Sequence, residues 1–105
     1  MMKLIGVTSC PSGVAHTYMA AEALETAARA KGWEAKIETQ GAIGIENELT
    51  AADIEAADVV VLTKDIAIKK EERFAGKKIV RVTVTQAAKQ APEIVSKLEA
   101  MLAQA

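Results

Sequence analysis

The sequence has a single cysteine among its 105 residues, so no disulfide can form within the chain. It also has a single histidine, and one cysteine with one histidine cannot supply the four ligands of a structural zinc site. We therefore expect no metal ion and no disulfide to stabilise the fold. The cysteine usage gives no sign of an oxidising compartment.

Aromatic residues and net charge are equally scarce. Phe, Trp and Tyr together make up 3% of the chain, which is too few to sandwich a flat cofactor such as a flavin. The 13 Lys and Arg residues oppose 14 Asp and Glu residues, and no basic stripe or block of like charge stands out. We therefore expect no cofactor, and no nucleic acid or anionic membrane surface as a partner.

Long hydrophobic runs are missing as well. No stretch approaches the roughly 18 apolar residues that a membrane-spanning helix needs. The run from Lys3 to Thr8 is too short for the apolar core of a signal peptide. The sequence therefore predicts a cytoplasmic chain that inserts no segment of its own into a membrane.

Short apolar runs, in contrast, are frequent, and half of all residues are hydrophobic. Leu4–Val7 and Val59–Leu62 are continuous runs, as in strands covered on both faces, whereas Ala35–Glu38 and Val80–Val84 alternate. We predict one α/β domain over residues 1–105, with three α/β/α layers around a four-stranded parallel sheet of order 2-1-3-4. In chain order, the second run (Ala35–Glu38) and the fourth run (Val80–Val84) would form its edges.

Helical patterns follow the apolar runs. After the first run, one apolar stripe is formed by Ala20, Ala23, Leu24, Ala27 and Ala28. Gly32 then suits the left-handed position at a helix end, and Thr50 with Asp53 predicts a capped helix start. A short charged helix would end at Gly76, and the last helix would hold Pro92 in its first turn or at a kink. Its apolar face comprises Ile94, Leu98, Met101 and Leu102.

The predicted strand order itself points to a functional site. In open α/β sheets, ligands bind beyond the carboxyl ends of the strands where the strand order reverses. Here this point lies between the runs Leu4–Val7 and Val59–Leu62. The predicted binding site is therefore the loop of residues 9–17, with residues 63–67 beside it. Cys10 stands at the head of that loop.

The residues around Cys10 suit a reactive thiolate and an anion. A cysteine between a strand end and a helix start has its thiolate stabilised by unpaired backbone N–H groups and the helix dipole. Gly13 lets the backbone curl, and Ser12 and Thr17 supply hydroxyls. Backbone N–H groups of Ser12 to His16, including Val14 and Ala15, could then hold phosphoryl oxygens. The alternative is a buried cysteine with a structural role only.

The spacing of Cys10 and His16 is that of the Cys-x5-Arg loop of cysteine phosphatases, with histidine in place of arginine. Arginine clamps phosphate with a planar and always charged group, whereas histidine is a weaker clamp near neutral pH. A weaker clamp suits a phosphoryl group that must leave again for another acceptor. Alternatively, His16 only packs against or caps the helix.

Other polar and apolar residues are candidates for the rim of the site. Gln40 and Gly41 could edge a partner surface or simply form a turn. Asp65 is a further candidate for this rim, although a solvated aspartate at a loop end is the more usual explanation. A possible apolar rim comprises Val14, Tyr18, Ile43 and Ile45. The run Lys69–Arg73 is interpreted as a solvated helix face with internal ion pairs, and Trp33 and Met101 as core.

The segment Cys10–Leu24, which reads CPSGVAHTYMAAEAL, resembles the phosphorylation-site signature of fructose-type enzyme IIB of the bacterial phosphoenolpyruvate-dependent sugar phosphotransferase system. Further stretches are similar to that family, namely Glu38–Gly41, Gly44–Asn47, Leu49–Thr50, Ala57–Asp58 and Arg73–Phe74. The similarity extends over nearly the whole chain.

This resemblance implies a flavodoxin-like or Rossmann-like fold and a phosphotransferase that passes through phosphocysteine at Cys10. The donor would be a phosphohistidine of enzyme IIA, and the acceptor fructose or a related sugar bound by the membrane component IIC. The chain would work at the inner face of the membrane through that IIC partner.

Two other classes of function are weighed against a phosphocarrier. The first is hydrolysis, as in low-molecular-weight phosphatases or arsenate reductases, against which the missing Arg at position 16 and the missing second cysteine argue. The second is a flavodoxin-like binding module, against which the scarcity of aromatic residues argues.

Overall fold

A computed structural model describes residues 2–9, 14–41 and 44–103 of the chain. The strands are β1 (Lys3–Thr8), β2 (Glu34–Gly41), β3 (Gly44–Glu46), β4 (Val59–Thr63) and β5 (Ile79–Val82). The helices are α1 (Val14–Ala30), α2 (Ala51–Ala56), α3 (Val84–Lys89) and α4 (Ala91–Ala103), with a 3-10 turn η1 (Glu71–Phe74).

The described strands form a single sheet of order β3-β2-β1-β4-β5. β1 pairs in parallel with β2 and with β4, and β4 pairs in parallel with β5. The predicted α/β class and the order of the four parallel strands are therefore confirmed. The prediction lacked β3, which pairs antiparallel with the end of β2 over Thr39–Gly41. Because β3 spans only 3 residues, it has no periodicity to detect.

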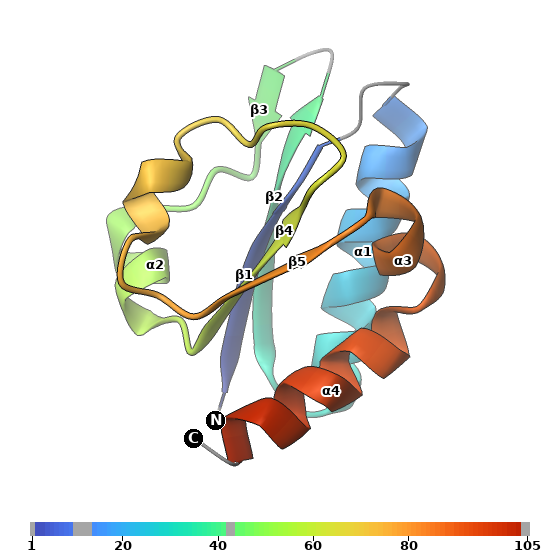
Figure 1. Cartoon of the computed structure of the whole chain (residues 1–105), viewed down its shortest axis with the longest axis vertical. Coiled ribbons are helices and arrows are strands. Elements are labelled where there is room, and N and C mark those ends of the chain that lie inside the picture. Colours follow the sequence, from blue (N-terminus) through green and yellow to red (C-terminus); the bar gives the residue numbers. More distant parts are fainter. Residues whose placement is uncertain (1, 10–13, 42–43, 104–105) are drawn as a thin grey trace.

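Helices cover both faces of this sheet, as Figure 1 shows. α1, α3 and α4 lie on one face, whereas α2 and η1 lie on the other. Side chains of β1 alternate between the two cores: Leu4 belongs to the core under α1, and Ile5 and Val7 belong to the core that includes Phe74 of η1. β1 and β4 are buried along almost their whole length, as their continuous apolar runs predict.

The helix starts and stops follow local chemistry. Thr50 and Asp53 form the predicted capping box at the start of α2, and Gly32 has the left-handed φ of 80° after α1. Pro92 lies in the first turn of α4. The predicted strand Val80–Val84 was too long, because Thr83 caps α3 through a capping box with Gln86 and Val84 is already helical.

Gly6 of β1 pairs with Val61 of β4. A Cβ atom on this residue would stand 2.6 Å from the carbonyl oxygen of Val61 and 3.1 Å from Cδ1 of Ile37. The first distance is well inside van der Waals contact with a backbone atom that the sheet holds in place. The two central strands therefore tolerate no side chain here.

We predict that Gly6→Ala lowers the free energy of unfolding by about 1–3 kcal/mol, the usual penalty for overpacking a tight core. The control is Gly41→Ala, since a Cβ on Gly41 meets no atom within 4 Å. Urea denaturation followed by circular dichroism measures both variants. Equal stability of the two variants would show that β1 and β4 can separate to admit a methyl group.

Candidate functional site

The candidate site lies at the carboxyl ends of β1 and β4, where the strand order reverses. The chain leaves β1 toward α1 and β2 on one side, and leaves β4 toward β5 on the other. The predicted site residues Cys10, Ser12 and Gly13 lie outside the described residues, and so do the side chains of Val14 and Ala15. The structure does describe the residues that hold both ends of this loop.

Ser9 holds the start of the loop through three hydrogen bonds. Its N–H donates to Oγ1 of Thr63 at 2.9 Å, and the Thr63 hydroxyl donates back to the Ser9 carbonyl oxygen at 3.2 Å. Its own hydroxyl donates to the carbonyl oxygen of Gln40 at 2.8 Å. Ser9 is only 3% exposed. The residue before Cys10 is thus fixed to the ends of both neighbouring strands.

The far end of the loop is fixed to β1 as well. The hydroxyl of Thr8, the last residue of β1, donates to the carbonyl oxygen of Thr17 in α1 at 3.0 Å. Thr17 is buried, whereas His16 on the same helical turn is exposed. The amino end of the 17-residue helix α1 therefore stands beside the carboxyl end of β1, and a helix amino end favours negative charge.

Gln40 lies at this edge, but its side chain points into the protein. Its amide donates to the carbonyl oxygen of Lys69 at 3.0 Å and accepts from the Lys69 N–H at 2.8 Å. The same amide donates to Oε2 of Glu38 at 2.9 Å. Gln40 therefore faces Ser9 through its backbone carbonyl and ties β2 to the segment after β4. Gly41, at the end of β2, is half-buried.

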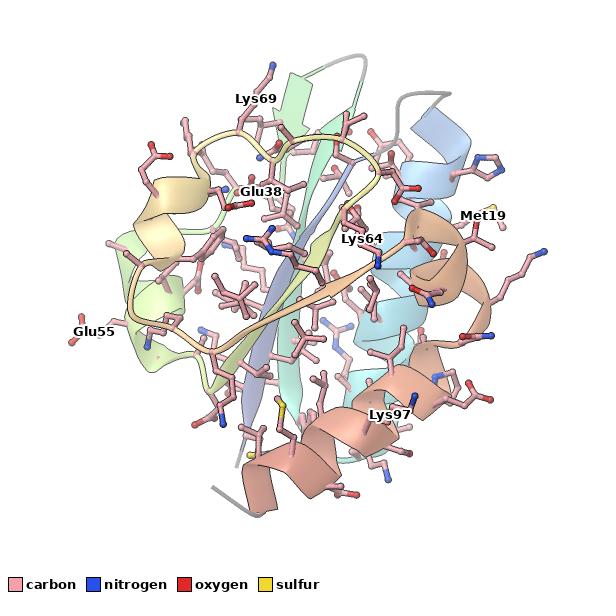
Figure 2. The ribbon with its side chains drawn as sticks, in the orientation of Figure 1. Met19, Glu38, Glu55, Lys64, Lys69 and Lys97 are labelled. Carbon is pink, nitrogen blue, oxygen red and sulfur yellow. The ribbon has the colours of Figure 1, made fainter. Side chains whose placement is uncertain are left out.

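Glu38 is a fully buried carboxylate that the sequence analysis did not single out for a role of its own. Figure 2 labels it on the face of the sheet that η1 covers. Arg73 of η1 donates to both of its oxygens, at 2.8 Å and 2.7 Å, and the Leu49 N–H donates to Oε1 at 2.9 Å. Burial alone would raise the pKa of Glu38, but these hydrogen bonds and that from Gln40 outweigh it and hold the pKa below its usual value.

Lys69, Lys70 and Glu72 are exposed, as predicted for the run Lys69–Arg73, but the predicted internal ion pairs are wrong. The Arg73 side chain is 16% exposed, stacks 4.8 Å from the centre of the Phe74 ring and pairs with Glu38 on β2. Lys70 pairs with Glu48, and Glu71 pairs with Arg81 of β5. All three of these ion-pair partners lie outside the run, which a local charge pattern cannot reveal.

Asp65, the third predicted rim residue, supports the turn into α3. Its carboxylate accepts a hydrogen bond of 2.7 Å from the N–H of Val84, the first residue of α3. The side chain remains exposed on the segment that follows β4. Its position beside the strand ends agrees with the topology, and its role in function is still a prediction.

Apolar side chains near the candidate site are partly exposed. Tyr18 is exposed and Ile45 half-buried, whereas Ile43 and the side chain of Val14 lie outside the described residues. Two more exposed apolar side chains are Ile66 and Met19, which is 57% exposed and lines a groove beside α1. Trp33 is buried and Met101 half-buried, as predicted for core residues.

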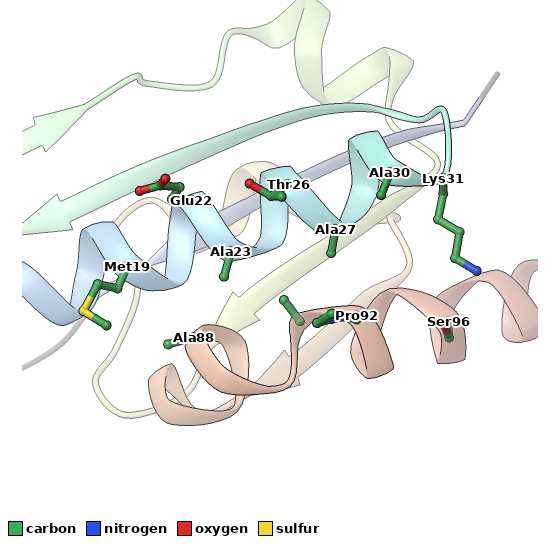
Figure 3. A pocket seen from close by; sticks show the side chains of 11 residues that line it. Met19, Glu22, Ala23, Thr26, Ala27, Ala30, Lys31, Ala88, Pro92 and Ser96 are labelled. Carbon is green, nitrogen blue, oxygen red and sulfur yellow. The ribbon is translucent and has the colours of Figure 1, made fainter.

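A groove of about 700 Å³ runs between α1 and the α3–α4 region, away from the strand ends (Figure 3). Its lining is mostly small and apolar and includes Ala23, Ala27, Ala88, Ala91 and Pro92. The hydrogen-bonded residues around Ser9 do not line it. We therefore place the candidate site at the strand ends and not in this groove.

Two further observations concern metals and membranes. Within the described residues, no three His, Cys, Asp or Glu side chains come together as a metal site. None of the described helices is both long and apolar enough to cross a bilayer.

Comparison with known protein families gives a match over most of the chain. The family described as "PTS system, Lactose/Cellobiose specific IIB subunit" matches residues 5–97. The "PTS system fructose-like EIIB component 2" of Escherichia coli K12 is 71% identical over 104 residues, which cover 99% of this chain and 98% of that protein. The "PTS system fructose-specific EIIB'BC component" of Rhodobacter capsulatus is 47% identical over 98% of this chain, but that stretch is only 17% of its own length.

Solved structures agree with this match. The solution structure of an Enzyme IIB subunit of the PTS system from Escherichia coli K12 superimposes with a TM-score of 0.93 at 45% identity, covering 98% of this chain and 95% of that chain. A domain of a fructose-specific IIABC component from Borrelia burgdorferi has a TM-score of 0.86 at 44% identity and covers 91% of each chain. The similarity thus includes all layers of the fold.

We predict that Glu38→Gln lowers the free energy of unfolding by about 3 kcal/mol near pH 7, because it leaves Arg73 half-paired in a buried place. Since the folded-state pKa of Glu38 is lowered, its ionised form stabilises the protein above the unfolded value of about 4.3. That contribution is lost as the pH falls through the folded-state pKa. The variant should therefore lose less stability on acidification than the wild type.

Denaturant midpoints at neutral pH and at several acidic pH values measure this difference. Glu71→Gln is the matched control, since it breaks an exposed Arg–Glu pair and should change stability little. Identical acid dependence in Glu38→Gln and the wild type would contradict the assignment.

Proposed function

Because the chain belongs to the fructose-type enzyme IIB family of the sugar phosphotransferase system, we propose that it carries a phosphoryl group on the thiolate of Cys10. The donor is a phosphohistidine of enzyme IIA, and the acceptor is fructose or a related sugar bound by the membrane component IIC. The supporting observation is the position of Cys10 directly after Ser9, where β1 leaves the sheet at the reversal of strand order.

The proposed chemistry comprises two in-line transfers at one sulfur atom. In the first, the Cys10 thiolate attacks the donor phosphorus, an S–P bond forms, and the N–P bond to the donor imidazole breaks. In the second, a sugar hydroxyl attacks the same phosphorus and gives its proton to a base at the acceptor site. The S–P bond then breaks and the thiolate is restored. The covalent intermediate divides one transfer into two easier steps.

Such transition states are loose, so the protein acts chiefly by positioning and by stabilising charge. We assign the phosphoryl oxygens to backbone N–H groups of the residues from Ser12 to His16, including Gly13, Val14 and Ala15. The hydroxyls of Ser12 and Thr17 assist, and His16 is the weak clamp. The amino end of α1 beside the strand ends supports this assignment, because a helix amino end favours negative charge.

Partners are proposed from the way the relatives are built. Names such as "EIIB'BC component" and "EIIBC component" describe relatives in which matching B parts occur in one chain with C parts. This supports a IIC partner for the present chain and a place of work at the inner face of the membrane. The exposed Tyr18, Met19, Ile66 and Asp65, with the half-buried Gly41, are the proposed contact region. Gln40, which is only 7% exposed, supports this region from inside.

Family membership also bears on the hydrolytic alternative. A phosphatase of the Cys-x5-Arg type keeps an arginine on the phosphate until water attacks. Here residue 16 is an exposed histidine, and the relatives are named as components of a transfer system. Transfer to a second acceptor is therefore favoured over hydrolysis.

We predict that incubation with phosphorylated enzyme IIA adds one phosphoryl group, seen by intact-mass spectrometry. Cys10→Ser and Cys10→Ala should both abolish the labelling while circular dichroism shows an unchanged fold. Labelling that persists in both variants would exclude Cys10 as the acceptor. Steady release of inorganic phosphate from small phosphate esters by the wild type would favour hydrolysis instead.

We also predict that the pKa of the Cys10 thiol lies below that of a free cysteine, about 8.5, because the amino end of α1 stabilises the thiolate. The rate of alkylation by iodoacetamide as a function of pH measures the midpoint. Free cysteine in the same buffers is the reference. A midpoint equal to that of the reference would argue against thiolate stabilisation by the loop.

A further inference from the structure

The hydroxyl of Thr63 forms hydrogen bonds with the backbone of Ser9, just beyond the point where the backbone pairing of the two central strands ends. The register of β1 and β4 runs from Leu4 with Val59 to Val7 with Leu62. Beyond this point, Oγ1 of Thr63 accepts the Ser9 N–H and donates to the Ser9 carbonyl oxygen. A side chain thus satisfies both backbone groups of the residue that precedes Cys10.

Threonine is an unexpected residue at this position on packing grounds alone. The preceding residues of β4 are all apolar, and Thr63 is only 1% exposed. Valine has nearly the same shape and would bury no hydroxyl, whereas a buried hydroxyl is unfavourable unless it is hydrogen-bonded. The hydroxyl is fully engaged here, and both of its hydrogen bonds go to Ser9.

The opposite side of Ser9 is held just as firmly. Its hydroxyl donates to the Gln40 carbonyl, and Gln40 is itself fixed through its side chain to both backbone groups of Lys69. Thr8 holds the far end of the loop by donating to the Thr17 carbonyl. Residues 10–13 therefore span two ends whose positions are set by hydrogen bonds from threonine side chains and from Ser9.

We propose that Thr63 is a positioning residue for phosphoryl transfer, which acts by fixing the backbone of Ser9 and hence the point from which Cys10 leaves the sheet. This inference rests on the proposed function of Cys10. In-line attack requires the sulfur to meet the phosphorus at a set distance and direction, and an error of about 1 Å can cost about 100-fold in rate. Thr63 contacts neither phosphate nor partner in this scheme.

The test compares Thr63→Val, Thr63→Ser and the wild type in phosphoryl transfer from phosphorylated enzyme IIA. Thr63→Val keeps the volume and removes both hydrogen bonds, so we expect kcat to fall by about 10- to 100-fold. The KM for the donor should change little, because the docking surface is intact. Thr63→Ser keeps the hydroxyl and should restore most of the rate.

The matched control is Thr50→Val, which removes a threonine hydroxyl that caps α2. Asp53, the capping-box partner of Thr50, pairs with Lys3 at the start of β1 and with Lys36, so this control lies away from the candidate site. It should lower stability, as cap removal usually does, and leave the transfer rate unchanged. A general loss of stability is thereby separated from a loss of positioning.

A second readout keeps this inference distinct from the proposed function. The pH midpoint of iodoacetamide alkylation should shift upward in Thr63→Val toward that of free cysteine, and it should be unchanged in Thr50→Val. If the wild type accepts no phosphoryl group, the proposed function is wrong, and the alkylation midpoints alone decide whether Thr63 positions Cys10.

The inference is overturned if Thr63→Val is less stable yet keeps the wild-type kcat and the wild-type alkylation midpoint. Thr63 would then serve stability only. Should Thr63→Val fail to fold by circular dichroism, Thr63→Ala and Thr63→Ser make the same comparison with smaller side chains. Equal transfer rates and equal midpoints in that pair would likewise overturn it.

Discussion

The buried ion pair between Glu38 and Arg73 connects β2 to η1 on the face of the sheet that α2 also covers. Glu38 receives hydrogen bonds from η1, from the Leu49 N–H before α2, and from Gln40 two residues further along β2. These donors come from three separate parts of the chain. A charge taken out of water requires such complete pairing, so the segments must meet at one point. Gln40 extends the pairing to Lys69, and its carbonyl reaches Ser9.

The candidate site therefore depends on hydrogen bonds with residues outside its loop. The Glu38–Arg73 ion pair joins β2 to η1, and hydrogen bonds to Thr63 and Gln40 hold Ser9 at the ends of β4 and β2. At this edge the polar residues Thr8, Ser9, Thr17, Gln40 and Thr63 are buried. Hydrogen bonds are directional, so they define the position of a backbone more sharply than apolar contacts do. Such definition agrees with the proposed role of Cys10, which requires the sulfur to be held in a set direction.

Much of this architecture was readable from local sequence patterns. The continuous runs in β1 and β4, the capping box of Thr50 and Asp53, and Gly32 each depend on neighbouring residues only. The strand order then located the candidate site before any motif was considered. The errors arose where the decisive partner is remote in the sequence. Arg73 was assigned to a solvated face because its partner Glu38 lies 35 positions away. Val84 was assigned to a strand because local alternation does not reveal that Asp65 and Thr83 stabilise the start of α3. The hydrogen bonds of Ser9 escaped prediction for the same reason, since Thr63 lies 54 positions away.

The two edges of the sheet carry a consequence for crowded solutions. β3 spans 3 residues and β5 spans 4, and Arg81 on β5 is held in an ion pair with Glu71. Unpaired strand edges are templates on which identical chains can add to one another, and short edges bearing charge are poor templates. The two edges of this sheet therefore disfavour strand addition between two copies of the chain.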